Sequence, residues 1–236
     1  MAIDGLSAHY GDFQALYDVS MRFPKGKIIS IIGSNGAGKS TLLNSVMGIV
    51  KPSAGKVCFA GKDVTGKRTS AIVANGITMS PEGSSVFEDM SVHENLLMGA
   101  YLPEARKRKD SLLARAYEIF PALKEKEKQL ATFLSGGQRQ MLAIGRALMS
   151  DPKLLICDEI SLGLAPVVVG DIYSRILDVN ESGVTVVLVE QEVKRSLEYS
   201  DYGYVLVKGR VVMEGETKDL SEEEVKEAYF GTGKYA

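Results

Sequence analysis

The chain has 236 residues, of which 45% are hydrophobic and 25% charged, and its formal net charge at pH 7 is −2. This length and composition are ordinary for one large globular domain, or for a domain that carries an insert. The nearly balanced charge argues against a basic nucleic-acid-binding chain, so we expect no nucleic acid partner. The two cysteines, Cys58 and Cys157, lie in separate apolar runs and predict neither a disulfide framework nor a cysteine metal site.

The sequence predicts no membrane segment of its own. A membrane-spanning helix needs about 20 apolar residues, and the apolar runs here, such as Val186–Val189, are far shorter. The start, Met1–Gly5, lacks the basic residues and apolar core of a secretory leader. If the protein serves a membrane process, we therefore expect other chains to supply the membrane part.

The first 80 residues predict short strands and helices around one glycine-rich loop. Runs rich in apolar and β-branched residues alternate with Gly and Pro turns. In chain order the predicted elements are strands over Leu16–Phe23 and Lys27–Ile32, a helix over Lys39–Met47, a strand over Lys56–Ala60, a helix over Arg68–Asn75 and a strand over Ile77–Met79.

The middle of the chain, from about Ser91 to Ser150, is helical in pattern. Leu112, Ala116, Ile119 and Leu123 recur at helical spacing. We predict an inserted helical subdomain at about residues 85–150 of a single domain that spans 1–236. The alternative is that these helices simply belong to the main domain.

Strands and helices alternate again after Pro152, which predicts an α/β fold with a largely buried sheet. The predicted elements are a strand over Lys153–Cys157, a helix over Pro166–Asn180, a strand over Val184–Val189, a helix over Gln191–Tyr199 and a hairpin formed by Tyr204–Val207 and Arg210–Met213.

A phosphate-binding loop is the first motif with a clear chemistry. The residues Gly33, Ser34, Asn35, Gly36, Ala37, Gly38, Lys39, Ser40 and Thr41 match G-x-x-x-x-G-K-[ST] in full, between a predicted strand and a predicted helix. Backbone N–H groups and the helix N-terminus would bind phosphate, Lys39 would neutralise its charge, and Ser40 would ligate Mg²⁺. The motif alone does not separate ATPases from kinases or GTPases.

Two carboxylates, Asp158 and Glu159, lie at the end of an apolar predicted strand. Successive strand residues point in opposite directions, so these two side chains should have different roles. We predict that Asp158 holds Mg²⁺ and that Glu159 orients or deprotonates the attacking water. The alternative is a helix cap or a solvated acid.

A second glycine motif, Ser135-Gly136-Gly137-Gln138, lies just before this strand. Ser135 can cap the helix that starts near Gly137, and the two glycines let an oxyanion approach the backbone. By itself the motif also fits an ordinary capped helix.

Together and in this order, the phosphate loop, Leu134–Gln138 and Leu154–Glu159 resemble the ATP-binding subunits of ABC transporters over essentially the whole chain. The resemblance implies a P-loop ATPase fold with a mixed central sheet, an antiparallel β subdomain and the helical insert. It also implies that ATP lies between two subunits, with Ser135–Gln138 acting on the partner's nucleotide, and that Tyr10 stacks on adenine.

Three positions depart from the usual family pattern. Glu82 stands at or beside the place of a Gln that senses Mg²⁺, Gln191 stands where a switch His is common, and Ile160 replaces a Pro. Glutamine can hydrogen-bond the γ-phosphate but cannot carry the charge of a protonated imidazole. At these positions and in the residues around them, the sequence is similar to that of the shorter ATP-binding subunit of branched-chain amino acid importers.

The resemblance implies several partners and a location. They are ATP with Mg²⁺, a second ATP-binding subunit that is identical or a companion, transmembrane permease subunits, and indirectly an extracytoplasmic solute-binding protein. The protein would work peripherally at the cytoplasmic face of the inner membrane. The alternatives are an ATPase of a lipid or lipopolysaccharide export system and an ABC ATPase without a transport role.

Overall fold

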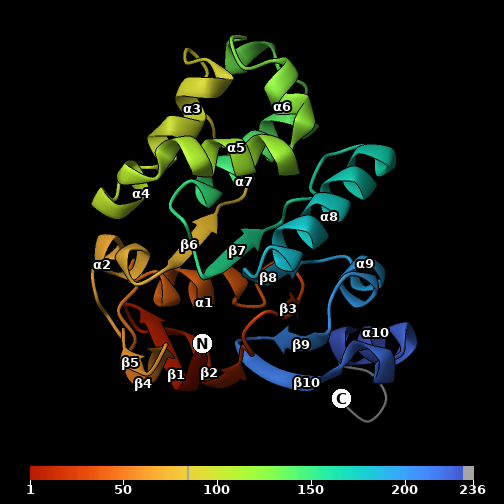
Figure 1. Ribbon diagram of the computed structural model, residues 1–236. Coiled ribbons are helices and arrows are strands. Elements are labelled where there is room, and N and C mark those ends of the chain that lie inside the picture. The colour runs from red at the N-terminus through yellow and green to blue at the C-terminus, as the bar shows by residue number, and fades with distance from the viewer. Residues whose placement is uncertain (84, 231–236) are drawn as a thin grey trace. The chain divides into compact units, whose positions relative to one another are not determined.

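The computed structural model describes residues 1–83 and 85–230. The chain forms two compact units (Figure 1). Unit 1 comprises Met1–Asn75 and Val187–Ala236, and unit 2 comprises Gly76–Val186. Strand β8 (Thr185–Glu190) carries the chain from unit 2 back into unit 1.

Unit 1 contains a four-stranded antiparallel sheet in the order β2-β1-β4-β5. Its strands are β1 (Ala2–Tyr10), β2 (Phe13–Arg22), β4 (Ala54–Phe59) and β5 (Lys62–Asp63). The sequence pattern predicts β2 and β4 but not β1. Gly5 has a φ of 61° and the β1–β2 register shifts around it, so the apolar residues of β1 do not alternate regularly.

The other strands of unit 1 form a mixed arrangement, as the family resemblance predicts. Strand β3 pairs in parallel with β9, and β9 pairs with β10 in an antiparallel hairpin. Lys208 and Gly209 form the two-residue turn, both with positive φ (46° and 75°), as a type I′ turn requires. The elements are β3 (Ile28–Ile32), β9 (Tyr202–Val207) and β10 (Arg210–Glu216).

Helices complete unit 1. They are α1 (Lys39–Val46), α2 (Thr69–Ala74), α9 (Val193–Glu198), α10 (Glu222–Phe230) and a 3₁₀ turn at Thr217–Asp219. Ile32 and Val205 of the sheet share one buried cluster with Val193 of α9 and Val225 of α10. Burial of this apolar surface fixes α9 and α10 against β3 and β9.

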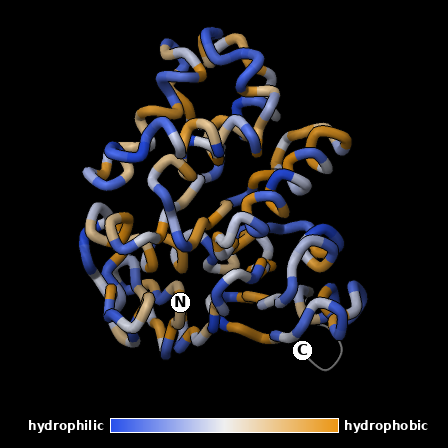
Figure 2. Tube along the Cα trace, viewed as in Figure 1, coloured by the Kyte–Doolittle hydropathy of each residue, from blue (hydrophilic) through white to orange (hydrophobic). Residues whose placement is uncertain are grey.

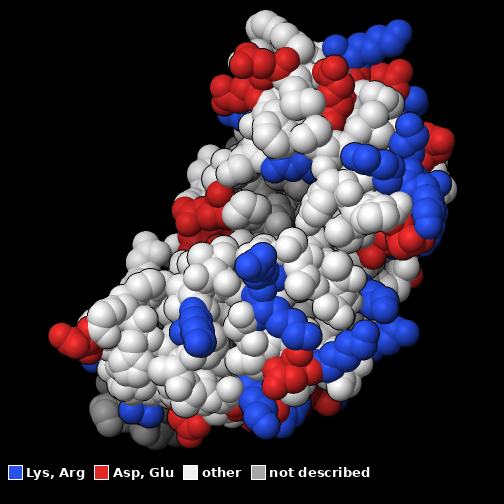
Figure 3. Space-filling model, turned by 90° about the vertical axis from the view of Figure 1, so that its left-hand side faces the viewer, with Lys and Arg blue, Asp and Glu red and all other residues white. Residues whose placement is uncertain are grey.

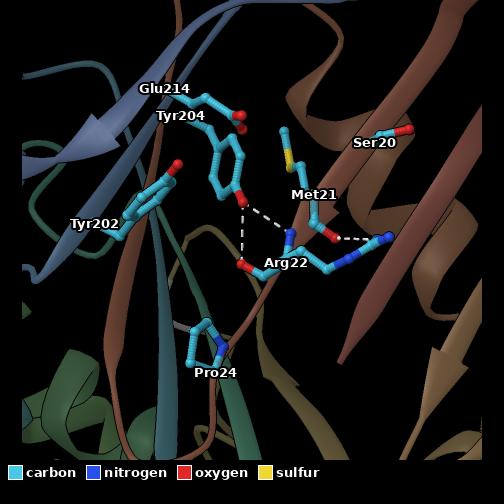
Figure 4. A pocket seen from close by; sticks show the side chains of 7 residues that line it. All are labelled: Ser20, Met21, Arg22, Pro24, Tyr202, Tyr204 and Glu214. Atoms are coloured by element: carbon cyan, nitrogen blue, oxygen red, sulfur yellow. Dashed lines mark hydrogen bonds between the residues drawn. The ribbon is translucent and has the colours of Figure 1, made fainter.

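The buried Tyr204 hydroxyl links β9 to the end of β2. It accepts a hydrogen bond from the Arg22 backbone N–H at 2.8 Å and donates one to the Arg22 carbonyl at 3.1 Å. Its ring also lies 6.2 Å from that of Phe23 and 5.1 Å from that of Tyr202, measured between centroids. Tyr202, Tyr204 and Arg22 line a surface pocket that also contains Glu214 (Figure 4).

We expect Tyr204→Phe to lower the free energy of unfolding by about 1–3 kcal/mol, because both Arg22 backbone groups lose their partner. Burial raises the pKa of Tyr204 to about 12. Since the folded protein disfavours tyrosinate, stability is full below about pH 10 and falls as the pH rises towards 12. Urea unfolding at pH 8 and pH 11 measures both effects.

Tyr101→Phe is the control at pH 8, because Tyr101 is 51% exposed. Part of the alkaline loss should persist in Tyr204→Phe, since burial also raises the pKa of Tyr117 in unit 2 to about 12. Equal stability of the two variants at pH 8 would contradict the role of the Tyr204 hydroxyl.

Unit 2 consists of two parallel strands and a series of helices. Strands β6 (Ile77–Ser80) and β7 (Leu154–Asp158) pair in parallel. The helices are α3 (Val92–Gly99), α4 (Pro103–Lys107), α5 (Lys109–Ile119), α6 (Pro121–Glu125), α7 (Gly136–Leu148) and α8 (Pro166–Glu181), with a 3₁₀ turn at Ala131–Phe133. The sequence predicts helices in the middle of the chain, and they are present there; the bounds of an inserted subdomain at 85–150 stay a prediction.

Close backbone approach holds α3 on α7. A Cβ atom on Gly99 would lie 1.9 Å from the Arg146 carbonyl oxygen, so only glycine fits at this crossing. The fully buried Asn95 of α3 binds the preceding loop, since its side chain accepts from the Phe87 N–H and donates to the Phe87 carbonyl. The loop after β6 is thereby fixed to the helices of unit 2.

The surface carries charged side chains of both signs as well as exposed apolar side chains. On the face that Figure 3 shows, acidic and basic side chains are interspersed among uncharged ones. Over the described residues, no helix combines the length and the apolar composition that crossing a bilayer requires. One end of α8 is hydrophobic (Figure 2), and Val167 in its first turn is 86% exposed.

Candidate functional site

The phosphate loop lies in unit 1, between the end of β3 and the start of α1. Gly36 and Gly38 have φ values of 80° and 104°, which other residues rarely adopt. Helix α1, which is described in full, begins without a side-chain cap and without an acidic residue in its first turn. Its first N–H groups and its positive dipole end are therefore suited to an anion.

Lys39 folds back over this loop. Its side chain is buried, and Nζ donates to the carbonyl oxygens of Gly33 and Ser34 at 2.8 and 3.1 Å. The ammonium group is thereby held beside the loop, where it can meet a phosphate. Ser40 is exposed and Thr41 is buried.

Two neighbouring segments of unit 1 support the loop. The Gly209 N–H donates to the Ala37 carbonyl at 2.8 Å, and the Tyr17 N–H donates to the Gly209 carbonyl at 2.9 Å. A Cβ atom on Gly33 would lie 2.6 Å from the Leu206 carbonyl oxygen, so glycine is needed there. The β9–β10 hairpin thus fixes the loop, a role that the sequence does not indicate for Lys208-Gly209.

Gln191 is also near the phosphate loop. The Gly33 N–H donates to the Glu190 carbonyl at 3.2 Å, so the chain leaves β8 next to the point where the loop begins. Tyr10 lies 50% exposed at the tip of the β1–β2 hairpin. Unit 1 therefore combines the phosphate loop with the predicted switch residue and the predicted adenine residue.

The acidic residues lie in unit 2, at one edge of the β6–β7 pair. Ser80 is the register partner of Cys157, so the segments after both parallel strands emerge at the same edge. Asp158 is the last residue of β7, Glu159 follows it, and Glu82 lies two residues beyond Ser80. Glu82 is exposed, whereas the other two carboxylates are half-buried. The structure thus brings the three predicted carboxylates to one strand edge.

Glu159 has a left-handed backbone. Its φ is 46°, which is uncommon for a residue other than glycine, and its carbonyl accepts from the Leu162 N–H at 3.2 Å. Such a conformation costs about 1–3 kcal/mol and persists only where the surrounding structure holds it. The turn that follows β7 therefore fixes the backbone from which the Glu159 side chain leaves.

Ser135 caps helix α7, as the sequence predicts, and Gln138 completes a capping box that the prediction did not include. The Ser135 hydroxyl accepts from the Gln138 N–H at 3.3 Å, and Gln138 Oε1 accepts from the Ser135 N–H at 3.1 Å. Since the hydroxyl accepts this bond, its own hydrogen can still be donated to an oxyanion. Ser135 is exposed, so an outside group can reach it.

The two glycines of this motif also have a packing role. A Cβ atom on Gly137 would lie 2.1 Å from Val168 Cγ1, and one on Gly136 would lie 3.1 Å from Leu164 Cδ2. The glycine pair therefore lets α7 lie close to the segment that begins α8. The sequence interpretation, which assigns both glycines to an approaching oxyanion, misses this contact.

No group of three or more His, Cys, Asp or Glu residues in the described part of the chain is arranged to hold a metal ion. A magnesium ion that is bound with a nucleotide needs only one or two protein carboxylates, because phosphates and water supply its other ligands. The predicted set of Ser40, Asp158 and Glu82 has the oxygen chemistry that Mg²⁺ prefers. The chemistry of these donors, taken residue by residue, suits a Mg²⁺ that arrives with its nucleotide.

Comparison with known proteins places these motifs in context. A family model described as ABC transporter matches residues 16–161. The chain is 43% identical to the high-affinity branched-chain amino acid transport ATP-binding protein BraG of Pseudomonas aeruginosa, over 98% of this chain and 99% of that protein. It is 38% identical to the probable branched-chain amino acid transport ATP-binding protein LivF of Archaeoglobus fulgidus, over 93% of each.

The fold is also similar to solved structures. One is the ADP conformation of an ATP-binding cassette of an ABC transporter, with a TM-score of 0.83 and 32% sequence identity over 97% of this chain and 94% of that one. The α/β fold with mixed and antiparallel sheets, predicted from the motifs, is confirmed by this similarity.

Proposed function

Because the chain belongs to the ABC transporter family, we propose that it is the ATPase subunit that powers the import of branched-chain amino acids through a partner permease. It binds and hydrolyses ATP, as members of this family do. The observation that carries the proposed substrate class is the 43% identity with BraG over nearly the full length of both chains. A companion or a second copy of the chain completes the working pair.

In this proposal, unit 1 binds the nucleotide. The N–H groups of the phosphate loop and Lys39 bind the β- and γ-phosphates, and Tyr10 stacks on the adenine. Gln191 accepts or donates a hydrogen bond near the γ-phosphate, and this group does not titrate. Ser40, Asp158 and Glu82 would hold Mg²⁺, which neutralises charge on the phosphates when bound.

Unit 2 supplies the groups for hydrolysis. Glu159 orients the attacking water and accepts its proton, and the left-handed turn at this residue holds the backbone that carries its carboxylate. Ser135–Gln138 of a second subunit bind the γ-phosphate through the exposed Ser135 hydroxyl and the start of α7. Charge stabilisation from this helix takes the role that an arginine finger has in other P-loop enzymes.

Exposed apolar side chains support the proposed protein partners. Leu162 and Val167, which flank the segment after Glu159, are 59% and 86% exposed and would contact the second ATP-binding subunit. In unit 2, Phe87 and Met98 are 46% and 48% exposed, and the Arg146 guanidinium lies 4.9 Å from the centroid of the Phe87 ring. A permease helix that contacts Phe87 would therefore contact the same segment of the chain that carries Glu82.

The test is transport in lipid vesicles that contain this subunit, its companion, the permease and the solute-binding protein. We expect leucine, isoleucine or valine, presented by the binding protein, to raise ATP hydrolysis and to be taken up in proportion to it. Vesicles with Glu159→Gln are the control and should do neither. The alternative outcome is a rate of ATP hydrolysis that changes with neither the amino acid nor the binding protein, together with outward transfer of lipid. That result would identify an export subunit instead.

A further inference from the structure

Two aromatic side chains, rather than one, lie exposed at the tip of the β1–β2 hairpin. Tyr10 is 50% exposed and Phe13 is 70% exposed. They are register partners on either side of the turn, in which Gly11 has the positive φ of 58° that the first position of a type II′ turn requires. Directly paired residues of antiparallel strands place their side chains on the same face of the sheet.

This face is the one that packs on the phosphate loop. Along β1, Tyr10 follows Ala8 by two residues and so lies on its face, and Ala8 pairs with Leu16 of β2. The register shifts between Ala8 and His9, where β2 has one extra residue, so the shared face is followed along β1 and reaches Phe13 through its pairing with Tyr10. Leu16 is fully buried, and its Cδ2 atom lies 3.1 Å from the place that a Cβ atom of Gly38 would take. The aromatic pair therefore extends the wall of unit 1 that begins at Gly38.

The polar neighbours of the pair are engaged elsewhere. Gln14 Nε2 donates to the Leu16 carbonyl at 2.9 Å, and His9 Nδ1 is hydrogen-bonded to Ser53 Oγ at 2.9 Å. The tip thus presents aromatic surface next to the phosphate loop. Such a surface suits the flat face of a nucleobase, which stacks on aromatic rings whatever its hydrogen-bonding edge.

We propose that Phe13 is a second base-contacting residue, which forms one stacking surface with Tyr10. This inference rests on the proposed function of the phosphate loop as an ATP site. Phe13 makes the affinity depend on the area of the base, so purine triphosphates bind more tightly than pyrimidine triphosphates. It contributes nothing to the binding of the phosphates themselves, which Lys39 and the loop hold.

The test compares the dissociation constants of ATP, UTP and inorganic tripolyphosphate for the full chain and for Phe13→Ala. A base stacked on an aromatic side chain is stabilised by about 1–3 kcal/mol, or roughly 5- to 150-fold in affinity. We expect Phe13→Ala to weaken ATP at least about 5-fold, UTP less and tripolyphosphate not at all. Phe13→Tyr should restore the affinity for ATP, since it keeps the ring.

Ile49→Ala is the matched control, because Ile49 is a 61% exposed apolar residue of unit 1 outside the hairpin. It should change none of the three affinities. If Phe13→Ala weakens ATP and tripolyphosphate equally, Phe13 only supports the loop through β2 and the proposal is wrong. An unchanged ATP affinity also overturns it. If the unaltered chain binds neither ATP nor tripolyphosphate, the proposed ATP site itself fails.

Discussion

Glu159→Gln should lower the rate of ATP hydrolysis by a factor of about 10²–10⁴, which is the usual contribution of a general base. Glutamine keeps the size and one oxygen of the side chain but cannot accept the proton of the attacking water. ATP affinity should stay within about two-fold, because the phosphate loop in unit 1 is untouched. Phosphate release under saturating ATP, together with the dissociation constant of ATP, measures both parts.

The same variant should also trap the ATP-bound pair of subunits, since hydrolysis is what separates them. Size-exclusion chromatography with ATP would then show a species of twice the mass that the unaltered chain forms only transiently. Glu118→Gln provides the control, because Glu118 is an exposed acid on α5 of the same unit. Steady-state hydrolysis by Glu159→Gln near the rate of the unaltered chain would remove Glu159 from the mechanism.

Local motifs were predictable from the sequence because the residues that form each of them are adjacent in the chain. The glycines and Lys39 of the phosphate loop require a strand before and a helix after, and β3 and α1 are found there. Ser135 is predicted to cap the helix that follows it, and its hydroxyl does accept from the Gln138 N–H. A run of four apolar residues before Asp158 predicts a strand that is covered on both faces, and these four residues of β7 are buried.

Contacts between distant segments were not predictable in this way. The sequence predicts that Gly137 lets an oxyanion approach the backbone. The lack of a side chain at Gly137 also makes room for Val168, which lies 31 positions further along the chain. The sequence predicts only a hairpin turn at Lys208-Gly209. In the structure the Gly209 N–H also donates a hydrogen bond to the Ala37 carbonyl of the phosphate loop. Phe13 carries no motif, and it is related to the proposed base contact only through its register with Tyr10.

Lys39→Met should lower the affinity for ATP by roughly 10- to 150-fold, because hydrogen bonds to a charged group contribute about 1.5–3 kcal/mol each. Methionine has a similar length to lysine but carries no charge and donates no hydrogen bond. Inorganic tripolyphosphate should lose affinity to the same extent, since Lys39 acts on the phosphates. This pattern is the opposite of that expected for Phe13→Ala, so the two variants separate the phosphate and base parts of one site.

Lys39→Met also removes the hydrogen bonds from Nζ to the Gly33 and Ser34 carbonyls, so its effect on folding needs a separate measurement. Thermal unfolding without nucleotide gives that part, and the stabilisation that added ATP provides gives the binding part. Lys51→Met is the matched control, because Lys51 is exposed in the loop after α1. A variant at Lys39 that unfolds at a lower temperature, yet gains as much stability from ATP as the unaltered chain, would show that Lys39 braces the loop without binding phosphate.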